Sequence, residues 1–291
     1  MKPAFQKDEA LLADIARARA SIQYSVFSIQ SSPHDARVRL WWLGQSGFLL
    51  HTRAGAVLFD PYLSDSLTTK YAATDKPHTR VTERVIAPER LTEIDVITSS
   101  HNHTDHLDAE TLLPLLAANP QARLVIPRAN RDSVLQRLGK VEPALVELDA
   151  GESVAVGGVE FYGIPAAHNT VERDEQGRCR FLGYVVRVGG IAIYHSGDTM
   201  MHPGLIPALL PFRVDVALVP INGNKPERRV AGNLNGREAA ALAHAIGARL
   251  AIPHHFDMFA FNTEPPDEFE AACRELGQPF CVLQNGEGVD L

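Results

Sequence analysis

The chain has few cysteines, no long apolar run and no excess of positive charge. Its three cysteines are scattered through 291 residues and form no CxxC pair. An odd, dispersed set of this kind argues against a disulfide framework and is typical of a protein of the reducing cytoplasm, where we expect this protein to act. Residues 7–20 carry charged side chains throughout, so we expect no secretion signal there.

Composition narrows the class of partner. No stretch approaches the roughly eighteen apolar residues of a membrane-spanning helix, so we expect no membrane partner. The formal net charge of −7 argues against a nucleic-acid partner, because phosphate backbones are bound by clustered lysine and arginine. A content of 45% hydrophobic and 22% charged residues is that of a soluble globular protein. We therefore expect a small-molecule substrate and leave a homo-oligomer open.

The order of apolar and turn residues predicts an α/β fold. Near-helical spacing of apolar residues predicts an amphipathic helix over 8–29. An antiparallel meander is predicted over 38–60, and the polar, threonine-rich residues 64–87 predict a long surface segment of the kind that often borders a site. From residue 94 onward, predicted strands alternate with helices. We expect one domain over 1–291, with residues 1–30 as an N-terminal helical extension.

A cluster of imidazoles directly follows the strand predicted at residues 94–98. His101, His103, Asp105 and His106 lie within six residues. A polar turn that is rich in histidine by chance would seldom have this spacing. The cluster lies on a loop at a sheet edge, where His101 and His103 can hold one divalent metal. Asp105 and His106 remain for a second metal or for a bound water.

Three further candidate ligands follow later predicted strands, and their loops converge if these strands run in one direction. A metal site needs about three protein ligands plus a water or hydroxide, whose pKa the metal lowers towards about 7. This chemistry predicts one or two divalent ions, zinc or manganese first and iron as the alternative. The predicted sets are His101, His103 and His168 for one metal and Asp105, His106 and His255 for the other, with Asp198 between them.

These motifs resemble those of a known superfamily. The run from His101 to His106 is similar to the signature of the metallo-β-lactamase superfamily, whose later histidine, Gly-Asp and final histidine occur here in the same order. Trp41-Trp42-Leu43-Gly44, the run 194–198 and the run 252–255 resemble the branch that contains L-ascorbate-6-phosphate lactonase. The N-acyl phosphatidylethanolamine phospholipase D group shares these features more loosely. The resemblance covers most of residues 38–291 and implies a four-layer αββα sandwich.

The resemblance also implies supporting roles. Asp60 matches the superfamily's supporting acidic residue, with no direct ligation. The Ile-Pro-x-His pattern selects His255 as ligand, which leaves adjacent His254 to orient a ligand or to meet the substrate.

The remaining candidates have two readings each. His195 is either a partner of a ligand or a packed core histidine. His202 either lines the pocket or begins a helix. Arg228, with Lys225 and Arg229, either receives a phosphate or carboxylate of the substrate or belongs to a solvated loop.

Two reactions fit this site. The first hypothesis is a hydrolase that uses a metal-bound hydroxide to open a lactone or ester of a small, sugar-acid-like metabolite. Asp105 or Asp198 would handle the proton. The alternative is a phosphodiesterase that acts on cyclic or glycerophospho diesters, with two metals holding the attacking and leaving oxygens.

Overall fold

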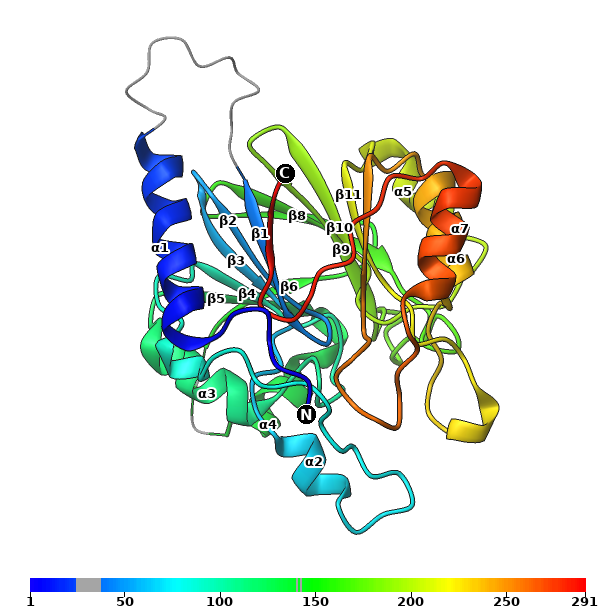
Figure 1. The fold of residues 1–291 in the computed structure, drawn as a ribbon, viewed down its shortest axis with the longest axis horizontal. Helices are drawn as coiled ribbons and strands as arrows, with labels where there is room; N and C mark the ends of the chain where they lie inside the picture. Colours follow the sequence, from blue (N-terminus) through cyan, green and yellow to red (C-terminus); the bar gives the residue numbers. More distant parts are fainter. Residues whose placement is uncertain (25–37, 140, 142) are drawn as a thin grey trace.

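Two β-sheets face each other between two layers of helices (Figure 1). The computed structural model describes residues 1–24, 38–139, 141 and 143–291. The first sheet has the order β13 (Gly288–Asp290), β1 (Arg39–Gly44), β2 (Gly47–Thr52), β3 (Gly55–Phe59), β4 (Val96–Thr98), β5 (Arg123–Pro127) and β6 (Ala144–Leu148). The second has the order β12 (Leu250–His254), β11 (Val216–Pro220), β10 (Ile191–His195), β9 (Leu182–Val188), β8 (Val159–Pro165) and β7 (Ser153–Val156). This architecture confirms the predicted αββα sandwich.

The helices cover the outer faces of the two sheets. On the side of the first sheet lie α1 (Asp8–Tyr24), α3 (Ala109–Ala118) and α4 (Arg131–Leu138), and on the side of the second lie α5 (Leu205–Leu209), α6 (Gly236–Ala245) and α7 (Asp267–Leu276). The short α2 (Ser66–Tyr71) lies among the loops at one end of the sandwich. Four 3-10 turns complete the described helices: η1 (Pro88–Arg90), η2 (Arg128–Asn130), η3 (Leu210–Phe212) and η4 (Pro226–Arg228). No helix that the structure describes could cross a membrane.

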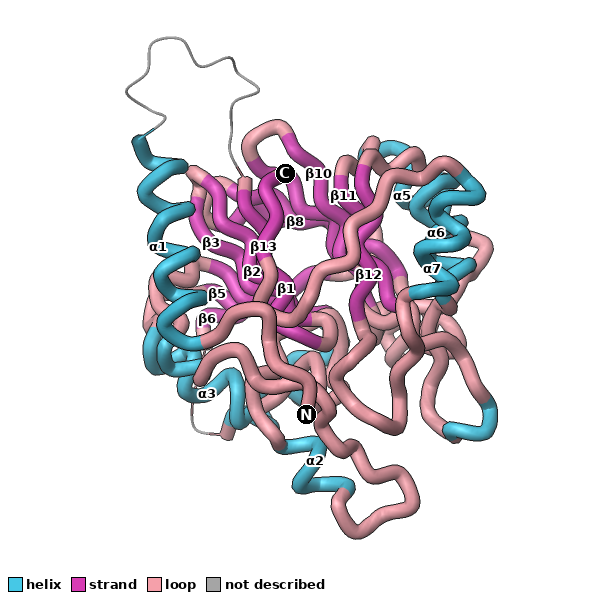
Figure 2. The backbone as a smooth tube through the Cα atoms, viewed as in Figure 1, coloured by secondary structure: helices cyan, strands magenta, loops and turns pink. Residues whose placement is uncertain are grey.

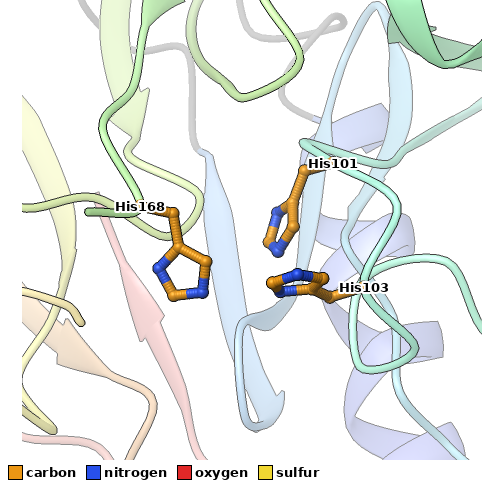
Figure 3. Close-up of side chains that lie close together, drawn as sticks. All are labelled: His101, His103 and His168. Carbon is orange, nitrogen blue, oxygen red and sulfur yellow. The ribbon is translucent and has the colours of Figure 1, made fainter. Parts of the chain in front are cut away.

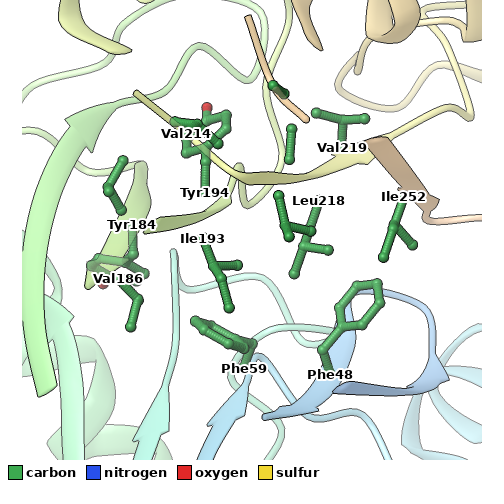
Figure 4. Close-up of a cluster of buried hydrophobic side chains, with 14 of the residues drawn as sticks. Phe48, Phe59, Tyr184, Val186, Ile193, Tyr194, Val214, Leu218, Val219 and Ile252 are labelled. Carbon is green, nitrogen blue, oxygen red and sulfur yellow. The ribbon is translucent and has the colours of Figure 1, made fainter. Parts of the chain in front are cut away.

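Apolar side chains from both sheets fill the space between them (Figure 4). Phe48 and Phe59 of the first sheet approach Ile193 and Leu218 of the second, and all four are fully buried. Burial of each such side chain stabilises the fold by about 1.5–3 kcal/mol. A second core lies between the first sheet and its helices, with Leu11 of α1 and residues of α3 and α4. The two cores fix the positions of the strand ends that carry the site.

The structure agrees with most of the predicted elements, differs from the sequence prediction in two places and leaves part of one predicted helix untested. The meander of β1, β2 and β3 is antiparallel as expected. Helix α1 ends at Tyr24, and residues 25–29 of the predicted helix lie outside the described residues. The segment 64–87 is not only surface, since it contains α2 and buries Val85 and Ile86. Strand β13 has only three residues and a partly exposed burial pattern, so it carries no periodicity that would predict it.

The strand directions bring several loops to one end of the sandwich. Strands β8 and β10 both run antiparallel to β9, and β10, β11 and β12 are mutually parallel. The carboxyl ends of β8, β10 and β12 therefore share one edge, which the loop after β4 of the first sheet meets. Figure 2 shows long loops gathered at this end of both sheets. The three later site loops thus share one sheet edge, as the sequence prediction required, and the loop after β4 comes from the other sheet.

Candidate metal centre

Three histidines from two loops form the first cluster. His101 and His103 follow β4, His168 follows β8, and their rings point toward a common space (Figure 3). One ring nitrogen of each lies within 4.8 Å of the others. His168 Nδ1 donates to the carbonyl of Gly232 at 2.7 Å, which leaves Nε2 for the cluster. His101 Nε2 is buried and has no hydrogen-bond partner among the described residues.

Two histidines of the first cluster, His101 and His103, stay neutral near pH 7. Burial, reinforced by His106 and His103, holds the pKa of His101 well below its usual range. His103 is open to solvent on one side, but the protein around its ring removes enough water that this desolvation and neighbouring His168 lower its pKa to about 4. A neutral imidazole presents the lone pair that a metal requires. The orphaned Nε2 of His101 and this neutral state fit a divalent metal.

Four side chains form the second cluster: Asp105, His106, Asp198 and His255. His106 Nε2 lies 3.3 Å from Asp198 Oδ1, and His255 Nε2 lies 3.4 Å from both Asp105 Oδ2 and Asp198 Oδ2. His106 Nε2 and Asp198 Oδ1 are buried without hydrogen-bond partners in the described residues. Asp198 Oδ2 also lies 3.6 Å from His168 Nε2, so this carboxylate stands between the two clusters.

Opposite charges oppose the cost of burial in the second cluster. Burial disfavours ionised Asp198, but His255 and His106 outweigh it and hold the pKa well below the usual range. Burial disfavours charged His255, yet Asp198 and Asp105 raise its pKa to about 9. Buried Asp198 and half-buried Asp105 therefore need positive charge beside them. A divalent cation between the four side chains would supply that charge, so these residues also fit a metal.

Asp60 supports the second cluster from behind. Its carboxylate accepts hydrogen bonds from Thr98 Oγ1 at 2.7 Å and from the backbone N–H of Ser100 at 3.1 Å. It also accepts one from His106 Nδ1 at 2.7 Å. Burial opposes ionisation, but the bond from His106 lowers the pKa of Asp60 below its ordinary value. Asp60 thus fixes the tautomer of His106 and lies outside both ligand clusters.

His195 and His254 pack behind the centre. His195 stacks between Phe59 and His254 at ring-centroid distances of 5.1 and 5.2 Å. Its Nε2 donates to the carbonyl of Ser46 at 2.8 Å. His254 Nδ1 lies 3.2 Å from Ser46 Oγ, and its Nε2 lies 3.3 Å from Ser196 Oγ. Both nitrogens of His254 are engaged, so it faces neither a metal nor the pocket.

His202 and Arg228 do not line the pocket over the clusters, contrary to the alternative that the sequence left open. His202 Nε2 donates to the carbonyl of Pro165 at 3.0 Å. Arg228 donates to the carbonyl of Asn222 at 2.7 Å and forms an ion pair with Glu264. Lys225 pairs with the same carboxylate at 2.5 Å. Glu264 lies far along the chain from this basic loop, and its ion pairs with Lys225 and Arg228 give the two basic residues a structural role.

A pocket of about 390 Å³ opens over the clusters. His103, Asp105, His168, Asp198 and His255 contribute to its lining. Four basic residues belong to its wall. The sequence predictions missed Lys70, Lys76 and Arg137, whereas Arg229 belongs to the basic loop that they named. The sequence holds one signal for the three missed residues, the polar character of the segment 64–87, which contains Lys70 and Lys76 but not Arg137.

The wall cations have different partners. The loop after β4 that carries His101 to His106 is called the ligand loop. Arg137 donates hydrogen bonds to the carbonyls of Asn102 at 2.7 Å and Leu107 at 2.9 Å, and so holds both ends of this loop. Lys70 Nζ lies 3.5 Å from Thr104 Oγ1. Arg229, also in the lining, pairs with Asp75. Among the described residues, Lys70, Lys76 and Arg137 form no ion pair with a carboxylate, so their positive charge is available to a bound molecule.

Comparison with known proteins assigns the chain to a family. The model of the beta-lactamase superfamily domain matches residues 56–256, which include all seven residues of the two clusters. A UPF0173 metal-dependent hydrolase of Rubrobacter xylanophilus is 31% identical over 249 residues, which cover 82% of this chain and 90% of the relative.

Solved structures agree on the fold. A metallo hydrolase from Ignicoccus hospitalis aligns with a TM-score of 0.65 at 19% identity over 88% of this chain and 98% of the other. An isothiocyanate hydrolase from Delia radicum gut bacteria aligns with a TM-score of 0.69 at 17% identity over 86% and 98%. The superfamily match, the relative and the shared fold together place the chain in the UPF0173 metal-dependent hydrolase family of the β-lactamase superfamily.

Proposed function

We propose that this metal-dependent hydrolase opens a lactone or another ester of a small, negatively charged, polar metabolite of the sugar-acid type. The observation that carries the proposal is the position of both ligand clusters beneath a small pocket whose wall bears cations without carboxylate partners. The resemblance of the strand-end motifs to those of L-ascorbate-6-phosphate lactonase supports the same substrate class.

The two clusters would hold one or two divalent ions, with zinc or manganese as the first candidates and iron as a further one. A bound ion would polarise the ester carbonyl and make a water molecule more acidic. His101, His103 and His168 would hold the first ion, and Asp105, His106, Asp198 and His255 the second. Asp60 would keep His106 in the tautomer whose Nε2 faces the cluster.

Asp105 and Asp198 have the chemistry of a general base. Both carboxylates line the pocket and belong to the second cluster. One of the two would take up the proton that the attacking water loses and would return it to the leaving oxygen. Asp198 is the better placed of the two, because its carboxylate contacts His106, His168 and His255 and so reaches both clusters.

The wall selects for size and charge. A volume of about 390 Å³ lies near the lower end of the range for small-molecule sites, about 300–1,000 Å³. Lys70, Lys76 and Arg137 would attract a carboxylate or phosphate group carried beside the scissile bond. Nucleic acid is a poor fit, since the chain as a whole carries a net charge of −7.

A second reaction remains a specific alternative. Asp198 stands between the clusters, and if each cluster held an ion, the two ions would supply positive charge for the attacking and leaving oxygens of a phosphodiester. The substrate would then be a cyclic or glycerophospho diester, whose charge suits the same basic wall.

The experiment is a turnover screen of metal-reconstituted protein against lactones and phosphodiesters, each offered in a neutral and an anionic form. We expect the anionic lactones to be opened with the highest kcat/KM, and the activity to vanish in Asp198→Ala but not in the control His244→Ala, whose side chain is exposed on α6. Preference for the diesters would favour the alternative reaction. Turnover of neither class would refute the proposal.

A further inference from the structure

The carboxamide of Gln45 lies inside the second cluster. Gln45 occupies the turn between β1 and β2 and is only 2% exposed. Its Nε2 lies 2.8 Å from Asp105 Oδ2 and 3.0 Å from His255 Nε2. One amide atom therefore contacts two of the four side chains that would hold the second ion.

The spacing of this amide atom is that of a ligand. Metal–nitrogen and metal–oxygen bonds of about 2.0–2.2 Å place neighbouring ligand atoms roughly 3–3.5 Å apart. Within the cluster, His106 and Asp198 are separated by 3.3 Å, and His255 and Asp105 by 3.4 Å. The 3.0 Å separation from His255 lies at the short end of the same range, and the 2.8 Å separation from Asp105 is slightly shorter and has the length of a hydrogen bond. The amide atom of Gln45 thus lies close to the place of a further ligand.

The oxygen of this carboxamide is also unpaired. Gln45 Oε1 is buried without a hydrogen-bond partner in the described part of the chain, as are His106 Nε2 and Asp198 Oδ1 of the cluster. A buried acceptor without a partner is unfavourable. A half-turn of the carboxamide exchanges its oxygen and nitrogen, which have almost the same shape. After that turn Oε1 would face Asp105, and a cation between the two oxygens would make the arrangement favourable.

The backbone holds Gln45 in this position. Its φ is +49°, in the left-handed region of backbone conformation that residues other than glycine seldom adopt. Its carbonyl accepts hydrogen bonds from Trp42 Nε1 and from the backbone N–H of His255, both at 3.0 Å. Such a conformation persists where the surrounding structure enforces it, often at functional sites. The turn is thus tied to the strand end that carries His255.

We propose that Gln45 is a fifth protein ligand of the second cluster and binds the metal through Oε1 after a half-turn of its carboxamide. The inference rests on the proposed metal centre and adds a neutral oxygen to its ligands. Amide oxygen suits harder cations such as manganese better than it suits softer ones. The second cluster should therefore bind manganese more tightly than a set of Asp105, His106, Asp198 and His255 alone would.

The test compares manganese binding to the wild type, Gln45→Ala and Gln45→Glu by chelator competition, with turnover measured separately. We expect Gln45→Ala to weaken the second cluster at least tenfold and to leave the first unchanged. Gln45→Glu should strengthen the second cluster about tenfold, because a carboxylate replaces a neutral ligand. Gln176→Glu, in an exposed loop, adds the same charge away from the site and should change neither.

The glutamate variant separates a ligand from a positioning residue. If Gln45 only donates Nε2–H to Asp105, Gln45→Glu removes the donor, places two carboxylates together and weakens binding. That result would overturn the inference, as would unchanged affinity in Gln45→Ala or a wild type whose second cluster takes up no metal. A crystal structure of the manganese-loaded protein should show Oε1 within about 2.3 Å of the ion. A protein that binds metal in this way but hydrolyses no substrate would refute the proposed function alone.

Discussion

The carboxylate of Asp60 accepts a hydrogen bond from His106 Nδ1 at 2.7 Å in a part of the protein that no solvent reaches. The contact joins the end of β3 to the ligand loop after β4 and leaves only His106 Nε2 to face the second cluster. Asp60, which belongs to neither cluster, therefore decides that Nε2 of His106 is the nitrogen that faces the second cluster.

Asp60→Asn should weaken metal binding at the second cluster by about 10–100-fold, because partners of metal-bound histidines have effects of this size. The variant keeps the shape of the side chain but loses the charge that holds His106. Chelator competition measures the effect, and Asp132→Asn, on the exposed side of α4, is the control. Equal affinity of wild type and Asp60→Asn would show that the carboxylate has only a packing role.

His103→Ala should abolish hydrolysis while the fold stays intact. His103 is exposed on the ligand loop and belongs to neither core, so its loss should change the free energy of unfolding of the metal-free protein by about 0.5 kcal/mol or less. Turnover and thermal unfolding of the metal-free protein check the two halves of the prediction. A variant that keeps full turnover would rule out the first cluster as part of the active site.

Adjacent His254 and His255 should respond differently to removal. His255→Ala should lose metal at the second cluster, because Nε2 lies 3.4 Å from two carboxylates of that cluster. His254→Ala should keep its metal and lose about 1–3 kcal/mol of stability, since Ser46 and Ser196 lose a buried partner. Metal titration of both variants, beside urea unfolding, provides the measurement. Loss of metal from His254→Ala but not from His255→Ala would reverse the assignment.

The hydrogen bond from Trp41 Nε1 to Asp14, at 2.8 Å, should make stability depend on acid pH. Burial opposes ionisation of Asp14, but Trp41, Gln6 and Arg39 outweigh it and lower its pKa from 3.8 to about 2. A lowered pKa in the folded state stabilises the protein above the unfolded value, and this contribution disappears as pH falls through about 2. Partial solvent screening leaves about 1–2 kcal/mol of the stabilisation at neutral pH.

Asp14→Asn should therefore be less stable than the wild type at pH 7, and the difference should shrink between about pH 4 and pH 2. Urea unfolding of the metal-free proteins across this range gives the comparison, with Asp132→Asn as the matched control. A difference in stability that does not change with pH would mean that the ionised form of Asp14 contributes nothing specific.

The seven cluster residues could be proposed from sequence because each follows a predicted strand. The four from His101 to His106 lie on one loop, and strand direction alone brings His168, Asp198 and His255 to the same end. Alternating helical and strand-like spacings predicted the α/β class, whereas the four layers followed only from the resemblance of the motifs to the metallo-β-lactamase superfamily.

The wall of the pocket could not be predicted in the same way. Lys70 lies 34 residues before its partner Thr104, and Arg137 lies 35 residues after its partner Asn102. The sequence left Arg228 open between a substrate contact and a solvated loop, because its partner Glu264 lies 36 residues away along the chain. Gln45 has no charge and no metal-binding motif, and only its approach to Asp105 reveals it. Contacts of this kind depend on packing and leave no local pattern.

The most direct test is the metal content of the purified protein, measured by elemental analysis for the wild type and for Asp198→Ala. Asp198 stands between the two clusters, so its loss should affect both. We predict one or two equivalents of zinc, manganese or iron in the wild type and markedly less in the variant. A wild type that contains none of these metals, and takes up none on reconstitution, would contradict the metal centre and the reaction built on it.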